Sequence, residues 1–171
     1  MNIVLIGYRG TGKSAVGRRL ADRLDLAFYD TDELVEERGG QTIQEMVAAK
    51  GWEFFRECEQ AVIRELSGID AAVIATGGGA ILYPDNVTLL KQSGRLIWLV
   101  ADADTIIGRM QADEGSEKQR PSLTGGEPAD ETSAVMAVRT PLYRKAADLS
   151  VETSGKSIEQ IVDEICSELA S

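Results

Sequence analysis

The residues with the clearest chemical use lie at positions 7–14, which read GYRGTGKS and fit the pattern G-x-x-x-x-G-K-[ST]. The glycines of such a stretch allow several backbone N–H groups to point at one phosphate group. Lys13 places a positive charge beside the outer phosphates of a nucleotide, and Ser14 offers a hydroxyl group to a Mg²⁺ ion. The stretch therefore predicts a binding site for a nucleoside triphosphate.

The elements that must position this loop can also be read from the sequence. An apolar run at residues 3–6 predicts a strand before the loop, and an amphipathic run at residues 15–24 predicts a helix after it. A helix that starts there adds the partial positive charge of its N-terminus to the site. The alternative is a glycine-rich turn that binds nothing, but the loop, the lysine, the hydroxyl and both flanking elements favour phosphate binding.

Two carboxylates follow the next predicted strand, at residues 26–29. Asp30 and Asp32 have one residue between them, so their side chains lie on the same side of an extended chain. The carboxyl end of a strand is the edge where open parallel sheets bind ligands. Asp32 could instead cap a helix predicted at residues 33–38, since aspartate is common at that position. The spacing leaves both interpretations open.

Three other features each allow a functional and an ordinary structural interpretation. Gly77, Gly78 and Gly79 follow a predicted strand and allow a ligand to approach the backbone closely, although a plain turn is the alternative. Arg56 lies in an amphipathic helix, where an arginine is ordinarily a solvated or ion-paired surface residue. The polar segment at residues 112–128 has no apolar periodicity and has the length of a lid, with Arg120 as its phosphate-facing residue. A disordered surface loop is the competing interpretation.

The whole pattern predicts a single α/β domain over residues 1–171. Strands and helices alternate, and the strands are continuous apolar runs, which is typical of a parallel sheet with helices on both faces. We expect five strands in a three-layer α/β/α arrangement. Further strands are predicted at residues 71–75, 95–100 and 149–152, and further helices at 42–50, 53–66, 84–92, 103–111, 129–147 and 157–169.

Composition excludes several classes of function. The net charge of −10 argues against a nucleic-acid surface, which needs a basic footprint. The chain contains no histidine, so Ser-His-Asp triads and histidine-ligated zinc are excluded, and a base near neutral pH must be a carboxylate or a perturbed lysine. No segment approaches the roughly 20 apolar residues of a membrane span. Cys58 and Cys166 match no metal-binding spacing, and the start of the chain lacks a basic leader, so we expect a cytoplasmic protein.

Over nearly its whole length the chain resembles the shikimate kinases, small P-loop kinases of aromatic amino-acid biosynthesis. Many nucleotide-binding proteins share the glycine loop, but the combination of motifs in this order is specific. The motifs are the loop at 7–14, Phe28-Tyr29-Asp30-Thr31-Asp32, Phe55-Arg56-Glu57-Cys58-Glu59, Thr76-Gly77-Gly78-Gly79-Ala80, Arg120-Pro121 and Arg139-Thr140-Pro141-Leu142-Tyr143.

The resemblance implies a P-loop kinase fold with a mobile lid, and a monomeric enzyme that transfers the γ-phosphate of ATP to the 3-hydroxyl of shikimate. Asp32 would hold the shikimate hydroxyls and serve as the base, and Arg56 and Arg139 would grip the carboxylate. The turn of Gly77, Gly78 and Gly79 would line the acceptor, with the Gly78 N–H directed to it. No nucleic acid or membrane partner is expected.

The same resemblance assigns the nucleotide side of the site. Ser14 would bind Mg²⁺ directly and Asp30 through water. Lys13, Asp32 and Arg120 would be the catalytic residues, with Arg120 closing from the lid onto the transferring phosphate. Arg109 and the turn from Ser154 to Lys156 would flank the adenine. The nucleotide-binding set is Gly10, Thr11, Gly12, Lys13, Ser14, Ala15, Arg109, Arg120 and Lys156.

Three features depart from the expected family pattern. Ser122 stands where a leucine is usual, Gly125-Gly126 loosens the far end of the lid, and Lys156 replaces a frequent arginine. These put lid dynamics and nucleotide affinity in question more than the reaction. One alternative is a related P-loop kinase for another small alcohol or a nucleoside monophosphate. A GTPase-like switch is disfavoured, because the chain lacks both Asp-x-x-Gly after a strand and Asn-Lys-x-Asp.

Overall fold

The computed structural model describes residues 1–112 and 128–171, and its strands form one parallel sheet. The order across the sheet is β2-β3-β1-β4-β5, with parallel pairing at every step. The predicted five-stranded parallel sheet is therefore confirmed. The strands are β1 (Asn2–Ile6), β2 (Ala27–Asp30), β3 (Ala72–Ala75), β4 (Gly94–Val100) and β5 (Leu149–Glu152), each within one residue of its predicted range.

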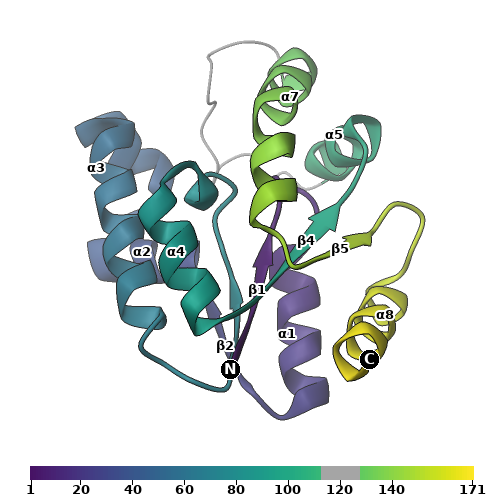
Figure 1. The fold of residues 1–171 in the computed structure, drawn as a ribbon. Coiled ribbons are helices and arrows are strands. Elements are labelled where there is room, and N and C mark those ends of the chain that lie inside the picture. Colours follow the sequence, from purple (N-terminus) through teal and green to yellow (C-terminus); the bar gives the residue numbers. More distant parts are fainter. Residues whose placement is uncertain (113–127) are drawn as a thin grey trace.

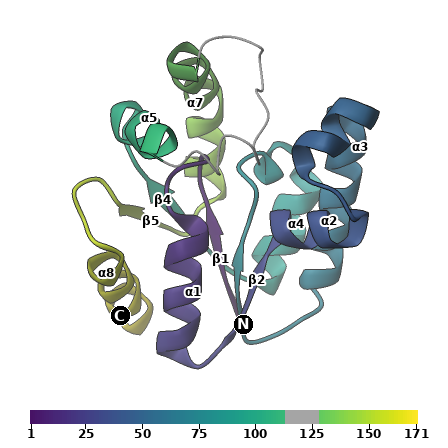
Figure 2. The same ribbon diagram turned by 180° about the vertical axis from the view of Figure 1, so that it is seen from behind.

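Helices cover both faces of the sheet, which confirms the predicted three layers (Figures 1 and 2). One face packs against α1 (Lys13–Leu24) and α8 (Ile158–Ala170). The other face packs against α2 (Thr31–Gly39), α3 (Ile43–Leu66), α4 (Pro84–Ser93), α7 (Pro128–Ala146) and the short 3₁₀ helix η1 (Ala80–Leu82). Helix α5 (Ala103–Ala112) follows β4 and packs beside α7.

Strand β1 shows why the sheet is buried on both sides. Ile3 and Leu5 pack in the core beneath α1 and α8, whereas Val4 and Ile6 pack in the core on the opposite face. Successive side chains of a strand point to opposite faces, so a central strand with helices above and below must be apolar throughout. The continuous apolar run near the start of the chain is thus the sequence signal of the central strand.

Glycines and polar caps set the ends of the helices around the sheet. Gly51 has a left-handed φ of 85° and interrupts α3, so the two helices predicted on either side of it meet there at a kink. Thr42 caps the first segment by accepting a hydrogen bond from the Glu45 N–H at 3.1 Å. Ser157 and Gln160 form the capping box at the start of α8.

The predicted lid falls mainly outside the described residues. Residues 113–127 are not described, and this range includes Arg120, Ser122 and the glycine pair at 125–126. The predictions for these residues therefore stay predictions. Within the described ranges, no helix combines the length and the apolar character needed to cross a membrane.

Candidate active site

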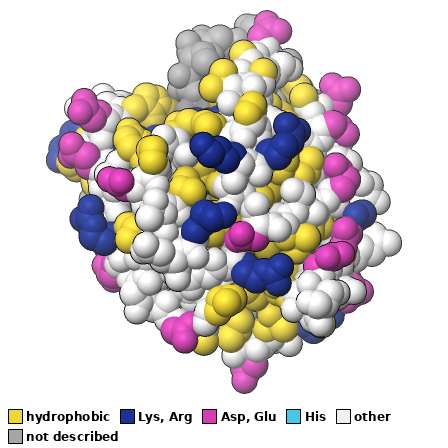
Figure 3. Space-filling model, viewed as in Figure 1, with side chains coloured by type: hydrophobic (Ala, Val, Ile, Leu, Met, Phe, Trp, Pro, Cys, Tyr) yellow, Lys and Arg dark blue, Asp and Glu magenta, His cyan; other side chains and the backbone are white. Residues whose placement is uncertain are grey.

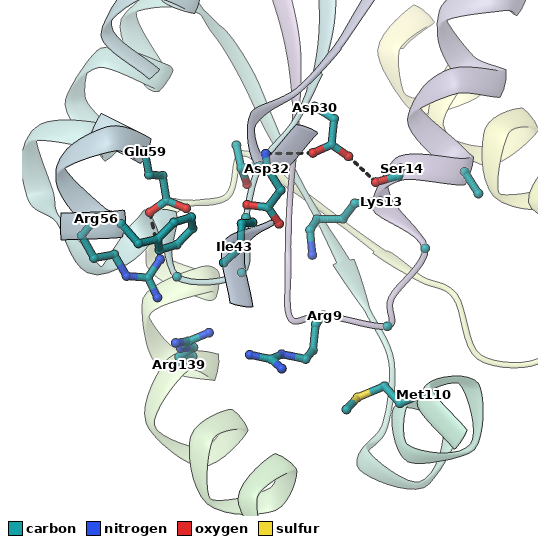
Figure 4. A pocket seen from close by; sticks show the side chains of 18 of the residues that line it. Arg9, Lys13, Ser14, Asp30, Asp32, Ile43, Arg56, Glu59, Met110 and Arg139 are labelled. Atoms are coloured by element: carbon teal, nitrogen blue, oxygen red, sulfur yellow. Dashed lines mark hydrogen bonds and ion pairs between the residues drawn. The ribbon is translucent and has the colours of Figure 1, made fainter. Parts of the chain in front are cut away.

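The carboxyl ends of β1, β2 and β3 open onto a cavity of about 290 Å³ (Figure 4). Side chains from α3, α5 and α7 close its sides. The cavity brings together most residues predicted for the site: Gly10, Gly12, Lys13, Ser14, Ala15, Asp30, Asp32, Arg56, Gly77, Gly78, Gly79, Arg109 and Arg139. Figure 4 shows Arg56 and Arg139 at one end, the contact of Ser14 with Asp30 at the other, and Asp32 and Lys13 between them.

The glycine loop has the backbone shape of an anion cradle. Gly10 and Gly12 have positive φ angles of 80° and 91°, and a Cβ at Gly7 would lie only 2.8 Å from the Leu99 carbonyl oxygen. Gly12 is the N-cap of α1, has no side chain with which to cap it, and is followed by a first turn without acidic residues. The first N–H groups of α1 therefore face a site suited to phosphate.

Lys13 and Thr11 both make hydrogen bonds with the loop itself. The Lys13 ammonium donates to the carbonyl oxygens of Gly7 at 2.6 Å and Tyr8 at 2.8 Å, which holds it inside the loop. The Thr11 hydroxyl donates to the Tyr8 carbonyl oxygen at 2.9 Å and is buried. Thr11 thus supports the loop from behind and does not line the cavity, although it was predicted among the nucleotide-binding residues.

Asp30 and Asp32 separate into two roles. One oxygen of Asp30 accepts a hydrogen bond from the Ser14 hydroxyl, and the other accepts from the N–H groups of Asp32 at 2.9 Å and Glu33 at 3.2 Å. Asp30 is therefore the cap of α2, and the alternative interpretation of Asp32 as that cap is wrong. The side chain of Asp32, in the first turn of α2, lines the cavity instead.

Arg56 is buried, with 8% of its surface exposed, and forms an ion pair with Glu59 one turn along α3. Its Nη1 lies 2.9 Å from Glu59 Oε1, and its guanidinium stacks over the rings of Trp52 and Phe55. The ordinary interpretation of this arginine as a solvated or ion-paired surface residue is right about the ion pair and wrong about the surface, because the pair is buried. Burial beside the cavity keeps its remaining N–H donors close to any bound acceptor.

Glu59 is a residue of the site to which the sequence analysis assigned no role. It is fully buried, and this burial raises the pKa of its carboxyl even though Arg56 and Arg139 favour the charged form. Its Oε2 has no hydrogen-bond partner among residues 1–112 and 128–171. The signal in the sequence is an acidic residue three positions after Arg56, on the apolar side of a helix.

The glycine turn at 77–79 allows charged side chains to approach the backbone. A Cβ at Gly77 would lie 2.6 Å from Glu59 Oε2 and 2.7 Å from Asp32 Oδ1. A Cβ at Gly79 would lie 2.2 Å from Arg56 Nη2, and one at Gly78 would lie 3.3 Å from Arg139 Nη1. Because three of these four distances are shorter than real Cβ contacts, the turn is more than a plain chain reversal.

Arg139 comes from α7 and lines the same end of the cavity as Arg56 (Figure 4). It is buried, with 7% of its surface exposed, and its guanidinium lies 5.9 Å from the centre of the Tyr8 ring. Arg9, which was given no role from the sequence, also lines the cavity and directs its guanidinium toward the region of Arg139 in Figure 4. Its position in the phosphate loop was the available signal.

Arg109 links the loop to the turn after β5. Its Nη1 donates to the Gly10 carbonyl oxygen at 3.2 Å, and its Nη2 donates to the Thr153 carbonyl oxygen at 3.2 Å. Lys156, predicted beside it, does not line the cavity. The Lys156 ammonium forms an ion pair with Glu164 of α8 at 2.6 Å. The structure therefore brings Arg109, but not Lys156, to the predicted nucleotide side.

Comparisons with known proteins agree with these motifs. The family model described as "Shikimate kinase" matches residues 9–170. The chain is 46% identical over 172 residues to the shikimate kinase of Syntrophus aciditrophicus, covering 96% of this chain and 88% of that protein. It is 43% identical over 169 residues to the shikimate kinase of Symbiobacterium thermophilum, covering 99% of this chain and 96% of that protein. A solved shikimate kinase from Acinetobacter baumannii in complex with shikimate has a TM-score of 0.93 at 34% identity, covering 99% of this chain and 92% of that one.

Proposed function

The chain belongs to the shikimate kinase family, and on this premise we propose that it transfers the γ-phosphate of ATP to the 3-hydroxyl of shikimate. The products are ADP and shikimate 3-phosphate. The observation that carries the proposal is the pair of buried arginines, Arg56 and Arg139, at the end of the cavity away from Ser14 and Asp30. A cavity with a phosphate loop at one side and two guanidinium groups at the other suits two anionic ligands of different kinds.

The acceptor end suits a small carboxylic acid that carries hydroxyl groups. A guanidinium can donate two parallel hydrogen bonds to one carboxylate, which an ammonium cannot do. Arg56 and Arg139 reach the cavity from different helices, so together they would hold a carboxylate from two directions. Gly79 lies close to Arg56 and Gly78 close to Arg139, and the N–H groups of these two glycines would add neutral donors for the acceptor, whereas the Gly77 N–H already donates to the Thr31 hydroxyl at 2.9 Å.

Asp32 would activate the acceptor hydroxyl. The 3-oxygen of shikimate attacks the γ-phosphorus, the bond from that phosphorus to the β–γ bridging oxygen breaks, and Asp32 takes the hydroxyl proton. No histidine exists in the chain to take this role. The γ-phosphate gains negative charge on its oxygens during the transfer, and Lys13 in the loop supplies positive charge beside them. Arg120 is proposed for the same task on the family resemblance alone.

Ser14 and Asp30 fit a magnesium site. They present a hydroxyl and a carboxylate in direct contact beside the phosphate loop, and oxygen ligands of these types are the ones that Mg²⁺ prefers. Ser14 would hold the ion directly and Asp30 through water. When bound, Mg²⁺ neutralises charge on the β- and γ-phosphate oxygens of ATP. Asp30 is held in place for this by the backbone of α2, because its second oxygen caps the helix.

An acceptor panel tests the proposal. ADP formation is measured at saturating ATP and Mg²⁺ with shikimate, AMP or gluconate as the acceptor, and without an acceptor. We expect turnover with shikimate to exceed the other three rates by at least about a hundredfold. AMP has no carboxylate for the arginine pair, and the flexible chain of gluconate does not hold its carboxylate and hydroxyls at the fixed relative positions that the shikimate ring gives them. A higher rate with AMP would instead indicate a nucleoside monophosphate kinase, with the two arginines on a phosphate. A higher rate with gluconate would indicate another alcohol as the acceptor.

A further inference from the structure

Tyr143 connects two parts of the acceptor site that belong to different elements. It lies on α7 with 2% of its surface exposed, and its hydroxyl donates a hydrogen bond of 2.6 Å to the Gly78 carbonyl oxygen. Its ring stacks on Trp98 of β4, with centroids 5.9 Å apart and planes 27° apart. The ring is therefore fixed by packing against the sheet, and the hydroxyl is fixed against the glycine turn.

The hydrogen bond sets the orientation of one peptide group in the turn. The carbonyl of Gly78 and the N–H of Gly79 belong to the same peptide plane and point in opposite directions. A donor that holds the carbonyl therefore also sets the direction of the N–H. Glycines have little intrinsic preference for one conformation, so a turn of three glycines needs such an external constraint to keep one orientation.

The same tyrosine is one helical turn from Arg139. The two residues are four positions apart on α7, so their side chains lie on the same face of the helix. A Cβ on Gly78 would lie 3.3 Å from Arg139 Nη1, so this arginine also lies against the turn. Arg139, Tyr143 and Gly78 thus form one contact between α7 and the glycine turn.

The hydroxyl is a donor at all ordinary pH values. Burial raises the pKa of Tyr143 to about 12, despite the opposing influence of Arg139. A tyrosine with a lower pKa would lose its proton as the pH rises, and the resulting anion would repel the carbonyl oxygen of Gly78. The contact therefore persists over the pH range in which a kinase is assayed.

We propose that Tyr143 is a positioning residue for the acceptor carboxylate. It keeps the glycine turn that follows β3 and the Arg139 side chain of α7 in a fixed position relative to each other. The inference rests on the proposed function, because it takes shikimate as the acceptor. It adds a residue that contacts neither the substrate nor the reacting atoms and acts through Gly78 and Arg139.

The test compares Tyr143→Phe with the parent protein, using shikimate and its methyl ester as acceptors. Phenylalanine keeps the ring on Trp98 and removes only the hydroxyl. We expect the KM for shikimate to rise about three- to tenfold, the factor that one neutral hydrogen bond typically controls, with kcat and the KM for ATP within about twofold. The methyl ester lacks the carboxylate charge, so its kcat/KM should be nearly the same in both proteins.

Tyr29→Phe is the matched control, because Tyr29 is a partly buried tyrosine of β2 outside the cavity. It should leave both acceptors unaffected. An unchanged KM for shikimate in Tyr143→Phe, with or without a lower Tm, would overturn the inference and leave the tyrosine with a packing role. An equal loss for shikimate and the ester would also overturn it. If the parent protein did not use shikimate at all, the proposed function itself would fail, and this inference with it.

Discussion

Asp30 and Asp32 differ in their contacts because a helix begins between them. The backbone N–H groups at the start of α2 occupy one oxygen of Asp30, so this carboxylate is held facing Ser14. Asp32 is already within the helix, and its side chain extends to the cavity beside Gly77. A single intervening residue therefore separates a fixed carboxylate, suited to a metal ion, from one that lines the cavity.

Replacing Asp32 with asparagine tests its role as the base. If Asp32 accepts the hydroxyl proton, Asp32→Asn should lower kcat by about two to four orders of magnitude, the usual contribution of a positioned base. The KM for ATP should change little, because the residue faces the acceptor. The unfolding midpoint should also be nearly unchanged, since Asp30 and not Asp32 caps α2. Steady-state kinetics and thermal melting measure both.

Glu33→Gln is the matched control on the same helical turn. Glu33 is exposed and forms an ion pair with Arg18, so its amide variant should retain normal kinetics. If Asp32→Asn retained near-normal kcat, the proton would have to leave by another route, and the assignment of Asp32 as the base would be wrong.

Glu59 gives the protein a specific dependence of stability on pH. Its pKa is raised by burial, so the folded protein binds this proton more tightly than the unfolded chain, where the carboxyl titrates near its ordinary value of 4.5. The unfolded chain then loses the proton first as pH rises. The contribution of Glu59 to the free energy of unfolding is therefore full below pH 4.5 and falls as pH rises through the raised pKa.

Glu59→Gln isolates this contribution, because glutamine does not titrate. We expect the free energy of unfolding of the parent minus that of the variant to decrease from pH 4 to pH 8. Urea unfolding at several pH values measures this difference. A difference that grew with pH would mean that Arg56 outweighs burial and lowers the pKa of Glu59, contrary to our account.

Residues of the site could be predicted from the sequence where a motif lies next to a predicted strand. The loop at 7–14 and the two aspartates follow predicted strands directly, and they lie at the cavity as predicted. Tyr143 received no role, because it contacts a residue that only the fold brings near. Glu59 received none although its partner Arg56 is three positions away, because only the fold shows that this pair is buried beside the cavity. The hydrogen bond from Tyr143 to Gly78, for example, crosses 65 positions of the chain.

Among the elements, the glycine turn shows how a backbone without side chains creates a site. Gly79 has φ −95° and ψ 5°, which other residues can also adopt, so conformational strain does not require glycine there. The lack of space requires glycine instead, because a Cβ at this position would lie 2.2 Å from Arg56 Nη2. The absence of a side chain therefore allows the guanidinium to lie against the turn.

Gly79→Ala should displace the guanidinium of Arg56 and leave the fold intact, because the clash is with the end of a flexible side chain. We expect the KM for shikimate to rise about ten- to a hundredfold, the range for losing a hydrogen bond to a charged group, with little change in the KM for ATP. Initial-rate kinetics with each substrate varied in turn would measure the split.

Gly108→Ala provides the same substitution at an open position. A Cβ at Gly108 would meet nothing within 4 Å, and the residue lies inside α5. Alanine is a better helix former there by about 0.8–1 kcal/mol, so this variant should be slightly more stable and kinetically normal. If both variants behaved alike, the close approach of Arg56 to Gly79 would have no bearing on acceptor binding.

The extents of the elements were predictable because their signals are physical requirements of a parallel sheet. Strands buried on both faces must be apolar throughout, and each was predicted to within one residue of its observed end. Caps were less certain. Asp30 and Asp32 are chemically identical, and only the backbone geometry at the end of β2 determines which one begins α2.

At the scale of the whole molecule, the fold concentrates positive charge in an acidic protein. The net charge is −10, yet the cavity is lined by five basic and three acidic side chains, so its walls carry a positive excess. The acidic residues lie mostly elsewhere. In Figure 3 most of the acidic side chains lie toward the rim of the face, whereas several of the basic side chains lie near its middle, over α4 and α7. A low pI is thus compatible with a site for two anions.

The arrangement of layers explains why Arg56 and Arg139 line one end of the cavity. Arg56 and Arg139 both belong to helices on the same face of the sheet, α3 and α7, while α1 and α8 cover the other face. Spacing in the sequence could not show that the two arginines meet. The family resemblance supplied that expectation, and the structure places both side chains on one cavity.

The most direct test of the whole account follows the phosphate itself. ³¹P NMR of a reaction with ATP, Mg²⁺ and shikimate would identify the product and give its amount relative to ADP. We predict one new phosphate monoester on the 3-oxygen of shikimate, formed in equal amount to ADP, and no consumption of ATP when shikimate is left out. Release of inorganic phosphate in place of the ester, or equal loss of ATP with and without shikimate, would contradict the account.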